Sequence, residues 1–321
     1  MIYEFFYSLV RQNKRSMEQL TKYLVEFGIT KPEVIQLSIP KCSEIAYAVK
    51  IDSAYRYVLW DYLKDKKDAL GLCPLVTATW GSGSSWKSTI VEEEFFSRYG
   101  FNEESARKDL SPQSIISRSR NTKTDSILTD HNKIYSEDLV DQIDYSVEHI
   151  RHAYGKSPSE QDVLTAMQSG SVNNYFDLQQ WFLKWCLSEI GLDKMSSSDN
   201  GYLDWYEPKD QKEAILMLPI KNSFEALAYV HWYGAEGVST EVAIAMFRKW
   251  SEKYQAELVA HYGTMLHVTV ATRPDNINES FSLAVEQESL APCTTALPGA
   301  ALHEFAVSLM SLNNWFLHER P

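Results

Sequence analysis

The sequence predicts an α+β protein, in which a mixed or antiparallel sheet with packed helices (ferredoxin-like elements) is combined with an all-α helical insertion. Three observations predict this class. Short β-branched apolar runs occur near both ends of the chain, helical periodicity fills its middle, and polar stretches separate these parts. The chain has 321 residues and 44% hydrophobic content, which suffices for two domains or for one domain with a large insertion.

The first expected part covers residues 1–102 and is α+β. Ser16 to Phe27 has the spacing of an amphipathic helix that ends at Gly28. Asp52 or Ser53 can cap a second helix that runs for about three turns. Strands are expected at three apolar runs, namely 34–39, 45–51 and 72–79.

A helical insertion is expected at residues 136–194, between two linkers. Residues 103–135 and 195–211 are polar with weak periodicity, which favours loops. Within the insertion a first helix ends at Gly155. The segment Ser157-Pro158-Ser159-Glu160 then has the spacing of a capping box with proline at the first helical position. A third helix, rich in aromatic residues, is expected to be buried.

The C-terminal part, residues 212–321, is expected to be a second α+β domain. Ser239 is a predicted helix cap, and Asn276 with Glu279 can form a capping box for the next helix. A last helix is expected at about 299–312. Strands are predicted at 215–220, 226–232 and 315–318, and a hairpin is predicted to join 258–260 to 266–271.

The bulk properties limit the classes of partner. The chain carries 43 acidic and 31 basic residues, for a net charge of −12, which opposes non-specific binding to nucleic acid and favours a basic protein partner. No leader pattern and no long apolar run is present, so we expect a cytoplasmic protein that does not enter a membrane. The cysteines are too widely spaced for a zinc knuckle or a disulfide scaffold: Cys42, Cys73, Cys186 and Cys293.

The loop GSGSSWKST at residues 81–89 differs by one residue from a phosphate-binding loop. Gly81, Lys87 and Ser88 are in register with the pattern G-x-x-x-x-G-K-[ST], but Trp86 occupies the position of the second glycine. An indole there would fill the space that the phosphates need. Nucleotide binding through this loop is therefore disfavoured, and no cofactor is expected.

Several other groups of residues have the side-chain types of a functional site. Glu148, His149 and His152 lie close on one helix, but the histidines are three residues apart rather than four, so no metal ion is expected. A polar site of His231, His267 and Glu286 could supply an acid and a base, although their spacing does not establish that they meet. Interfaces favour loop aromatics, and the candidate partner-binding residues are Trp80, Trp86, Trp232 and Glu236.

The insertion contains a segment, GKSPSEQDVLTAMQSGSVNNYFDLQQW, that resembles a helix-turn-helix of DNA-binding proteins. A reading helix needs cationic and amide side chains that face the groove. This one offers Asn173, Asn174 and Gln179, with Lys184 as its only cation. Ordinary helical packing is therefore favoured over DNA recognition.

Residues 247–287 (FRKWSEKYQAELVAHYGTMLHVTVATRPDNINESFSLAVEQ) combine a tryptophan-bearing helix, an acidic strand, a hairpin, a proline and an Ala-x-Glu helix. This pattern resembles a bacterial family, domain of unknown function 4253, best over 214–318, more weakly over 53–80, and not over 100–205. The resemblance implies an α+β domain with no established activity. The matching positions are Trp250, Tyr254, Ala256, Glu257, Leu258, Pro274, Ala284, Glu286, Trp315 and Phe316, with Gly71 to Leu75 near the front.

The chain departs from the family pattern at two motifs. Where relatives have Cys-Pro-Asp, this chain has Ala291-Pro292-Cys293, and a glycine, tryptophan and asparagine loop is replaced by residues 234–237. The favoured function is a non-catalytic, cytosolic protein-binding module, most concretely an immunity-type protein that neutralises a basic toxin or effector. The alternatives are a nucleotide-dependent enzyme or a hydrolase of unknown substrate, and DNA binding through the helical insertion. No oligomeric state follows from the sequence.

Overall fold

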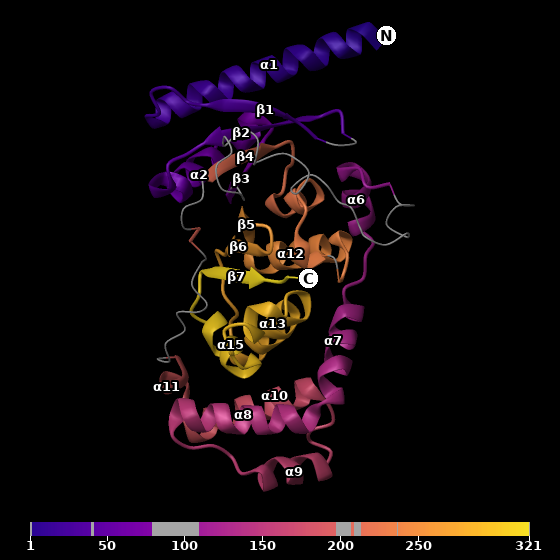
Figure 1. The fold of residues 1–321 in the computed structure, drawn as a ribbon, viewed down its shortest axis with the longest axis vertical. Helices are drawn as coiled ribbons and strands as arrows, with labels where there is room; N and C mark the ends of the chain where they lie inside the picture. Colours follow the sequence, from indigo (N-terminus) through magenta and orange to yellow (C-terminus); the bar gives the residue numbers. More distant parts are fainter. Residues whose placement is uncertain are drawn as a thin grey trace. The chain divides into compact units, whose positions relative to one another are not determined.

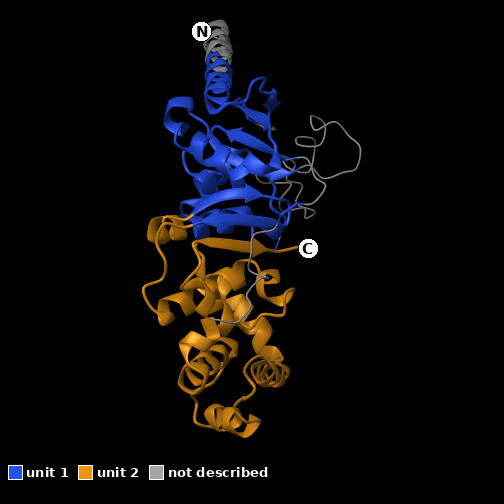
Figure 2. Ribbon diagram, turned by 90° about the vertical axis from the view of Figure 1, so that its left-hand side faces the viewer, with its two compact units in different colours: residues 1–122, 206–248, 257–269 blue, residues 123–205, 249–256, 270–321 orange. Residues whose placement is uncertain are grey.

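The computed structural model describes residues 2–39, 42–78, 109–196, 207–208, 213–235 and 237–320, with side chains from residue 15 onward. The chain forms two compact units, which Figure 2 colours separately. The first contains residues 1–122, 206–248 and 257–269, and the second contains residues 123–205, 249–256 and 270–321. The C-terminal part that the sequence defined as residues 212–321 therefore contributes to both units.

The first unit is built around a sheet whose two central strands are buried along their whole length. Its strands follow the order β1-β2-β4-β3-β5-β6 (Figure 1). Neighbouring strands are antiparallel except β3 and β5, which run parallel with Val76 opposite Ala260. All residues of β3 and β4 are buried, so both faces of these strands are covered. The strands are β1 Val34–Ser38, β2 Ile45–Lys50, β3 Cys73–Ala78, β4 Glu213–Leu218, β5 Glu257–His261 and β6 Met265–Thr269.

Helix α2 (Arg56–Lys64) packs on β3 and β4. Its Trp60 donates a hydrogen bond from Nε1 to the carbonyl oxygen of Pro74 at 3.0 Å. Asp52 caps the short 3-10 helix η1 (Ser53–Tyr55) that leads into α2. Further helices of this unit are α1 Ile2–Phe27, α3 Lys67–Leu70, α6 Pro112–Ser119, η3 Ser223–Ala228 and η4 Tyr233–Ala235, and α12 (Thr240–Tyr254) contributes residues to both units.

The second unit is mainly helical. Helices α13 and α15 pack against each other, and α10 packs on α15 and α7. Helix α10 buries Leu178, Phe182 and Cys186, which recur every four residues on one side. The elements are α7 Asp125–Glu137, α8 Leu139–Tyr154, α9 Glu160–Gln168, α10 Tyr175–Glu189, α11 Leu192–Ser196, α13 Ile277–Leu290, α14 Cys293–Ala296, α15 Leu302–Leu309 and β7 Asn314–His318.

The α+β class is confirmed, but three local predictions are wrong. The range 103–135 was expected to be a loop, yet its described part contains α6 and most of α7, each anchored by a buried isoleucine (Ile115 and Ile127). Residues 226–232 were predicted as a strand, but they begin within the buried 3-10 helix η3, because a short apolar run has no diagnostic period. The capping box of α9 was placed at Ser157 to Glu160, but the helix is capped two residues later, by Ser159 with Asp162.

None of the helices within the described ranges is long and apolar enough to cross a lipid bilayer.

Candidate functional site

Helices α7 and α8 of the second unit carry a row of exposed carboxylates. Asp141, Asp144 and Glu148 follow one another at steps of three and four residues, which places them on one side of α8, and Glu137 ends α7 just before the chain turns at Asp138. The opposite side of α8 packs into the unit through Ile143, Val147 and Ile150. We call the exposed sides of α7 and α8 the acidic face, which contains one cation, Lys133, and otherwise comprises Asp130, Ile134, Glu137, Asp138, Val140, Asp141, Asp144, Tyr145 and Glu148.

Three large apolar side chains lie among these carboxylates. Ile134 is 63% exposed, Val140 is 65% exposed and Tyr145 is 47% exposed. Single exposed apolar residues are common on protein surfaces. Here Val140 and Tyr145 lie among the carboxylates of α8, and Ile134 lies between those of α7, which is the composition of a surface that can bury apolar area and pair with cations at the same time.

The carboxylates of the acidic face have no ion-pair partner among the described residues. Other exposed acidic groups do, for example Glu189 with Lys156 at 3.2 Å and Glu33 with Lys50 at 3.1 Å. Unneutralised carboxylates repel one another at such spacing and raise the negative potential above the helices. The acidic face therefore attracts cationic groups more strongly than its residue count alone would suggest.

The acidic face is held on a rigid support. The hydroxyl of Tyr145 donates to the carbonyl oxygen of Gly299 at 2.9 Å. On the same helix His149 Nε2 lies 2.6 Å from Glu304 Oε2, and the Tyr154 hydroxyl donates to Glu304 Oε1 at 2.9 Å. The hydrogen bond to Glu304 raises the pKa of His149. Burial alone would raise the pKa of Glu304, but its bonds with His149 and Tyr154 lower it overall.

The first unit contains a second polar group of residues, which we call the Arg56 cluster. Arg56 Nη1 donates to Glu213 Oε2 at 2.7 Å and Nη2 donates to Glu207 Oε1 at 2.9 Å. The Tyr262 hydroxyl donates to the other oxygen of Glu213 at 3.1 Å. The remaining members are Tyr57 and His267, whose hydroxyl oxygen and Nδ1 lie 3.3 Å apart.

Burial determines the protonation of this cluster. Burial lowers the pKa of His267 to about 3, with a further contribution from the Arg56 charge, so the imidazole is neutral at physiological pH. Burial would also lower the pKa of Arg56, but the bond and charge of Glu213 raise it overall, and the guanidinium stays charged. The cluster thus holds one cation, one buried carboxylate and one neutral imidazole.

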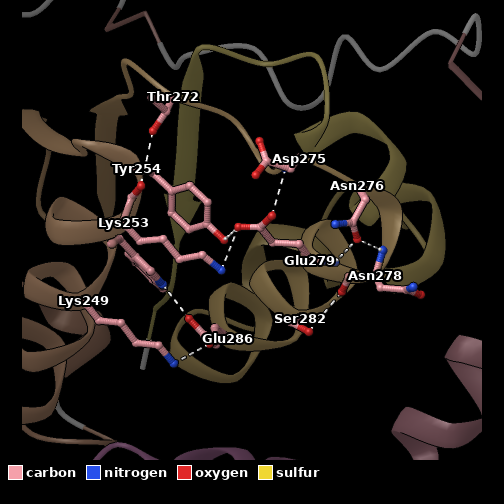
Figure 3. A network of polar contacts seen from close by, with 11 residues as sticks. Lys249, Lys253, Tyr254, Thr272, Asp275, Asn276, Asn278, Glu279, Ser282 and Glu286 are labelled. Atoms are coloured by element: carbon pink, nitrogen blue, oxygen red, sulfur yellow. Dashed lines mark hydrogen bonds and ion pairs between the residues drawn. The ribbon is translucent and has the colours of Figure 1, made fainter.

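The structure gives the three residues of the predicted polar site different neighbours. His231 follows η3, and its ring meets that of Tyr233 edge to face at 4.9 Å. His267 belongs to the Arg56 cluster of the first unit. Glu286 belongs to the second unit, where it accepts from Lys249 at 2.6 Å and from Trp250 Nε1 at 2.8 Å (Figure 3). An acid–base role for these three residues stays a prediction.

The residues predicted to contact a partner divide into two groups. Trp232 is buried and donates from Nε1 to the carbonyl oxygen of Thr264 at 3.1 Å, so it supports the first unit and is not available at the surface. The others lie outside the described residues, as does the whole glycine–serine loop: Trp80, Gly81, Trp86, Lys87, Ser88 and Glu236.

Two further expectations concern the helical insertion. No group of histidine, cysteine and carboxylate side chains suited to a metal ion occurs among the residues that the structure describes, and His149 is bonded to Glu304 instead. Gln179, a candidate base-reading residue, is buried and bonds through Oε1 with His303 Nδ1 at 2.9 Å. A buried side chain cannot enter a DNA groove, so Gln179 is not available to read bases in the DNA-binding alternative.

A comparison with protein families gives one match. Residues 214–318 match the family described as domain of unknown function 4253. No curated protein and no solved structure matches the chain. The acidic face lies outside the matched residues 214–318, whereas Tyr262 and His267 of the Arg56 cluster lie inside them.

The aromatic residues that carry the family resemblance pack together in the second unit. The Trp315 ring meets those of Trp250 and Tyr254 edge to face, at 6.0 and 5.6 Å. Beside them Lys253 and Tyr254 bind Glu279 as Lys249 and Trp250 bind Glu286 (Figure 3). These residues therefore contribute to the packing between α12, α13 and β7.

Proposed function

We propose that this protein is a non-catalytic binding module that docks a basic, amphipathic protein surface on the acidic face of α7 and α8. The observation that carries the proposal is the alternation of carboxylates, which have no ion-pair partner among the described residues, with three exposed apolar side chains on the successive helices α7 and α8. A partner that brings lysine or arginine at helical spacing would neutralise the carboxylates, and its apolar side would cover Ile134, Val140 and Tyr145.

The negative charge of the chain favours a cationic partner for the acidic face. The whole chain carries −12, and acidic residues outnumber basic ones two to one in residues 123–196. Long-range attraction of this kind accelerates encounter with a cationic partner, whereas the buried apolar area sets how long the complex lasts. An immunity-type protein that neutralises a basic toxin or effector in the cytosol is the most concrete form of this proposal.

The test uses a labelled peptide with leucines at helical spacing and lysines at the other positions, measured by fluorescence anisotropy. The variant Asp141→Lys/Asp144→Lys reverses two charges on the acidic face. It should weaken binding about tenfold at low salt, which is about 1.4 kcal/mol. The control Asp65→Lys/Asp68→Lys makes the same change in net charge at exposed positions of the first unit, and it should change binding less than twofold (about 0.4 kcal/mol).

A second pair of variants tests the apolar component. Val140→Ser should weaken binding about fivefold at low and high salt, because it removes buried apolar area and no charge. Val58→Ser is the matched control, since Val58 is also exposed but lies on α2 of the first unit. Equal weakening by both charge pairs, or no effect of Val140→Ser, would show that only net charge matters and would end the proposal. For the immunity form, failure to co-purify with any basic product of a neighbouring gene would count against it.

A further inference from the structure

The Arg56 cluster lies at a place in the sheet where ligand sites are common. Strands β3 and β5 form the parallel pair, and ligands of sheets with parallel strands bind beyond the carboxyl ends of those strands. Glu213 is opposite Ala78, the last residue of β3, and Tyr262 directly follows the last residue of β5. At this end of the two strands the Tyr262 hydroxyl donates a hydrogen bond to Glu213, and Arg56 donates another to the same carboxylate.

The guanidinium of Arg56 has one side in use and one side only half used. Nη1 is paired with Glu213, whose side chain is fully buried. Nε and Nη2 form the opposite edge, which can hold both oxygens of a single carboxylate. Nη2 donates to Glu207, but Nε is buried and has no hydrogen-bond partner among the described residues. A buried donor without an acceptor is unfavourable, so this edge has unused capacity for an oxyanion.

The Glu207 carboxylate occupies this edge of Arg56, and a ligand can displace it. The Glu207 side chain is 71% exposed and makes a single bond to Arg56, whereas the Arg56 side chain is only 10% exposed. An ion pair with one exposed partner contributes little, so a ligand competes with Glu207 on favourable terms. Glu213 cannot be displaced in the same way, because it is buried and also accepts from Tyr262.

We propose that Arg56 binds the carboxylate of a small-molecule ligand through Nε and Nη2, at the position that the Glu207 carboxylate occupies in the structure.

The charges of the cluster favour a carboxylate over a phosphate. Exchange of Glu207 for a ligand carboxylate leaves the net charge of the cluster unchanged. A phosphate dianion would add a negative charge next to Glu213, and His267 is neutral and offers no second cation. The ring of Tyr57 lies 5.1 Å from the guanidinium carbon, so an aromatic surface borders the same group. An aromatic carboxylate such as benzoate is therefore a better probe than acetate.

The test measures the binding of benzoate, acetate and orthophosphate to the full chain by isothermal titration calorimetry. Glu207→Gln keeps the shape of the side chain and removes the competing charge. It should strengthen benzoate binding about fivefold, which is about 1 kcal/mol. Glu33→Gln is the matched control, because Glu33 is also an exposed carboxylate of the first unit paired with one cation. It should leave benzoate binding unchanged.

A second variant tests the guanidinium. Arg56→Lys keeps the charge but removes the two-donor edge, and it should abolish the gain when combined with Glu207→Gln. Three results would overturn the proposal: no binding of benzoate to Glu207→Gln, equal strengthening by Glu33→Gln, or binding of orthophosphate in preference to both carboxylates. The Glu207 variant changes an exposed residue, so it remains informative even if Arg56→Lys does not fold.

Discussion

The two carboxylates that hold Arg56 differ in burial, and this difference predicts very different effects of removing each one. Glu213→Ala leaves a charge on a side chain that is only 10% exposed, without its buried partner. Breaking a buried pair in this way costs about 3–5 kcal/mol, and the Tyr262 hydroxyl also loses its acceptor, at about 1 kcal/mol. Glu207→Ala removes a partner that is 71% exposed, so it should cost about 1 kcal/mol or less.

Urea unfolding measures the difference. With a dependence of about 2 kcal/mol per molar urea, a 3 kcal/mol gap between the variants moves the midpoint by roughly 1.5 M. Intrinsic tryptophan fluorescence follows the unfolding, and Trp60, a buried residue of α2, contributes to the signal. The double variant Arg56→Met/Glu213→Leu should recover most of the loss, because the uncompensated charge is gone. Equal midpoints for Glu207→Ala and Glu213→Ala would refute the claim that Glu213 is the buried partner of Arg56 and Glu207 the exposed one.

Three further predictions concern the second unit and the thiols. His149→Gln should destabilise the protein below pH 6 and have less effect above pH 8. The hydrogen bond to Glu304 raises the pKa of His149 in the folded state. The stabilisation by this pair is therefore complete below the unfolded-state pKa of about 6.5, and it is lost as the pH rises through the folded-state pKa. Urea midpoints below pH 6 and above pH 8 measure this loss. Trp315→Ala should cost about 3–5 kcal/mol in the same assay, because the ring is buried against Trp250. At pH 8 a thiol reagent should label Cys42 and Cys293, which are partly exposed, faster than Cys73 and Cys186, which are buried. Burial raises the pKa of all four thiols, but it raises those of Cys73 and Cys186 to about 12, so these two should react only on unfolding.

Helix starts were predictable where a local hydrogen bond determines them. Asn276 accepts from the amides of Asn278 and Glu279 at the start of α13, and Ser239 accepts from the amide of Val242. The hairpin of β5 and β6 and the strand near the end of the chain were also predicted, because their period and turn residues lie within a few positions of one another. The helices of residues 112–137 were missed, because each uses few buried apolar residues and its exposed side is mixed in charge.

The candidate sites depend on burial and on contacts between distant residues, which local spacing does not predict. The carboxylates of α8, Asp141, Asp144 and Glu148, were not predicted as a site, and only the structure shows that Val140 and Tyr145 beside them are exposed. Arg56 and Glu213 are 157 residues apart, and no spacing rule connects an arginine at a helix start with a glutamate at a strand start.

By itself, the sequence determined the α+β class, the strongly negative charge, the resemblance of residues 214–318 to the domain of unknown function 4253, and the helix caps, because each of these depends on composition or on residues that are near neighbours in the chain. The tertiary structure alone decided which carboxylates are neutralised. It pairs Glu213, Glu286 and Glu304 with partners from distant segments, and it leaves those of the acidic face without an ion-pair partner among the described residues. The physical reason is that a charge is stabilised by the groups within a few ångströms of it, and folding, rather than chain order, chooses those groups.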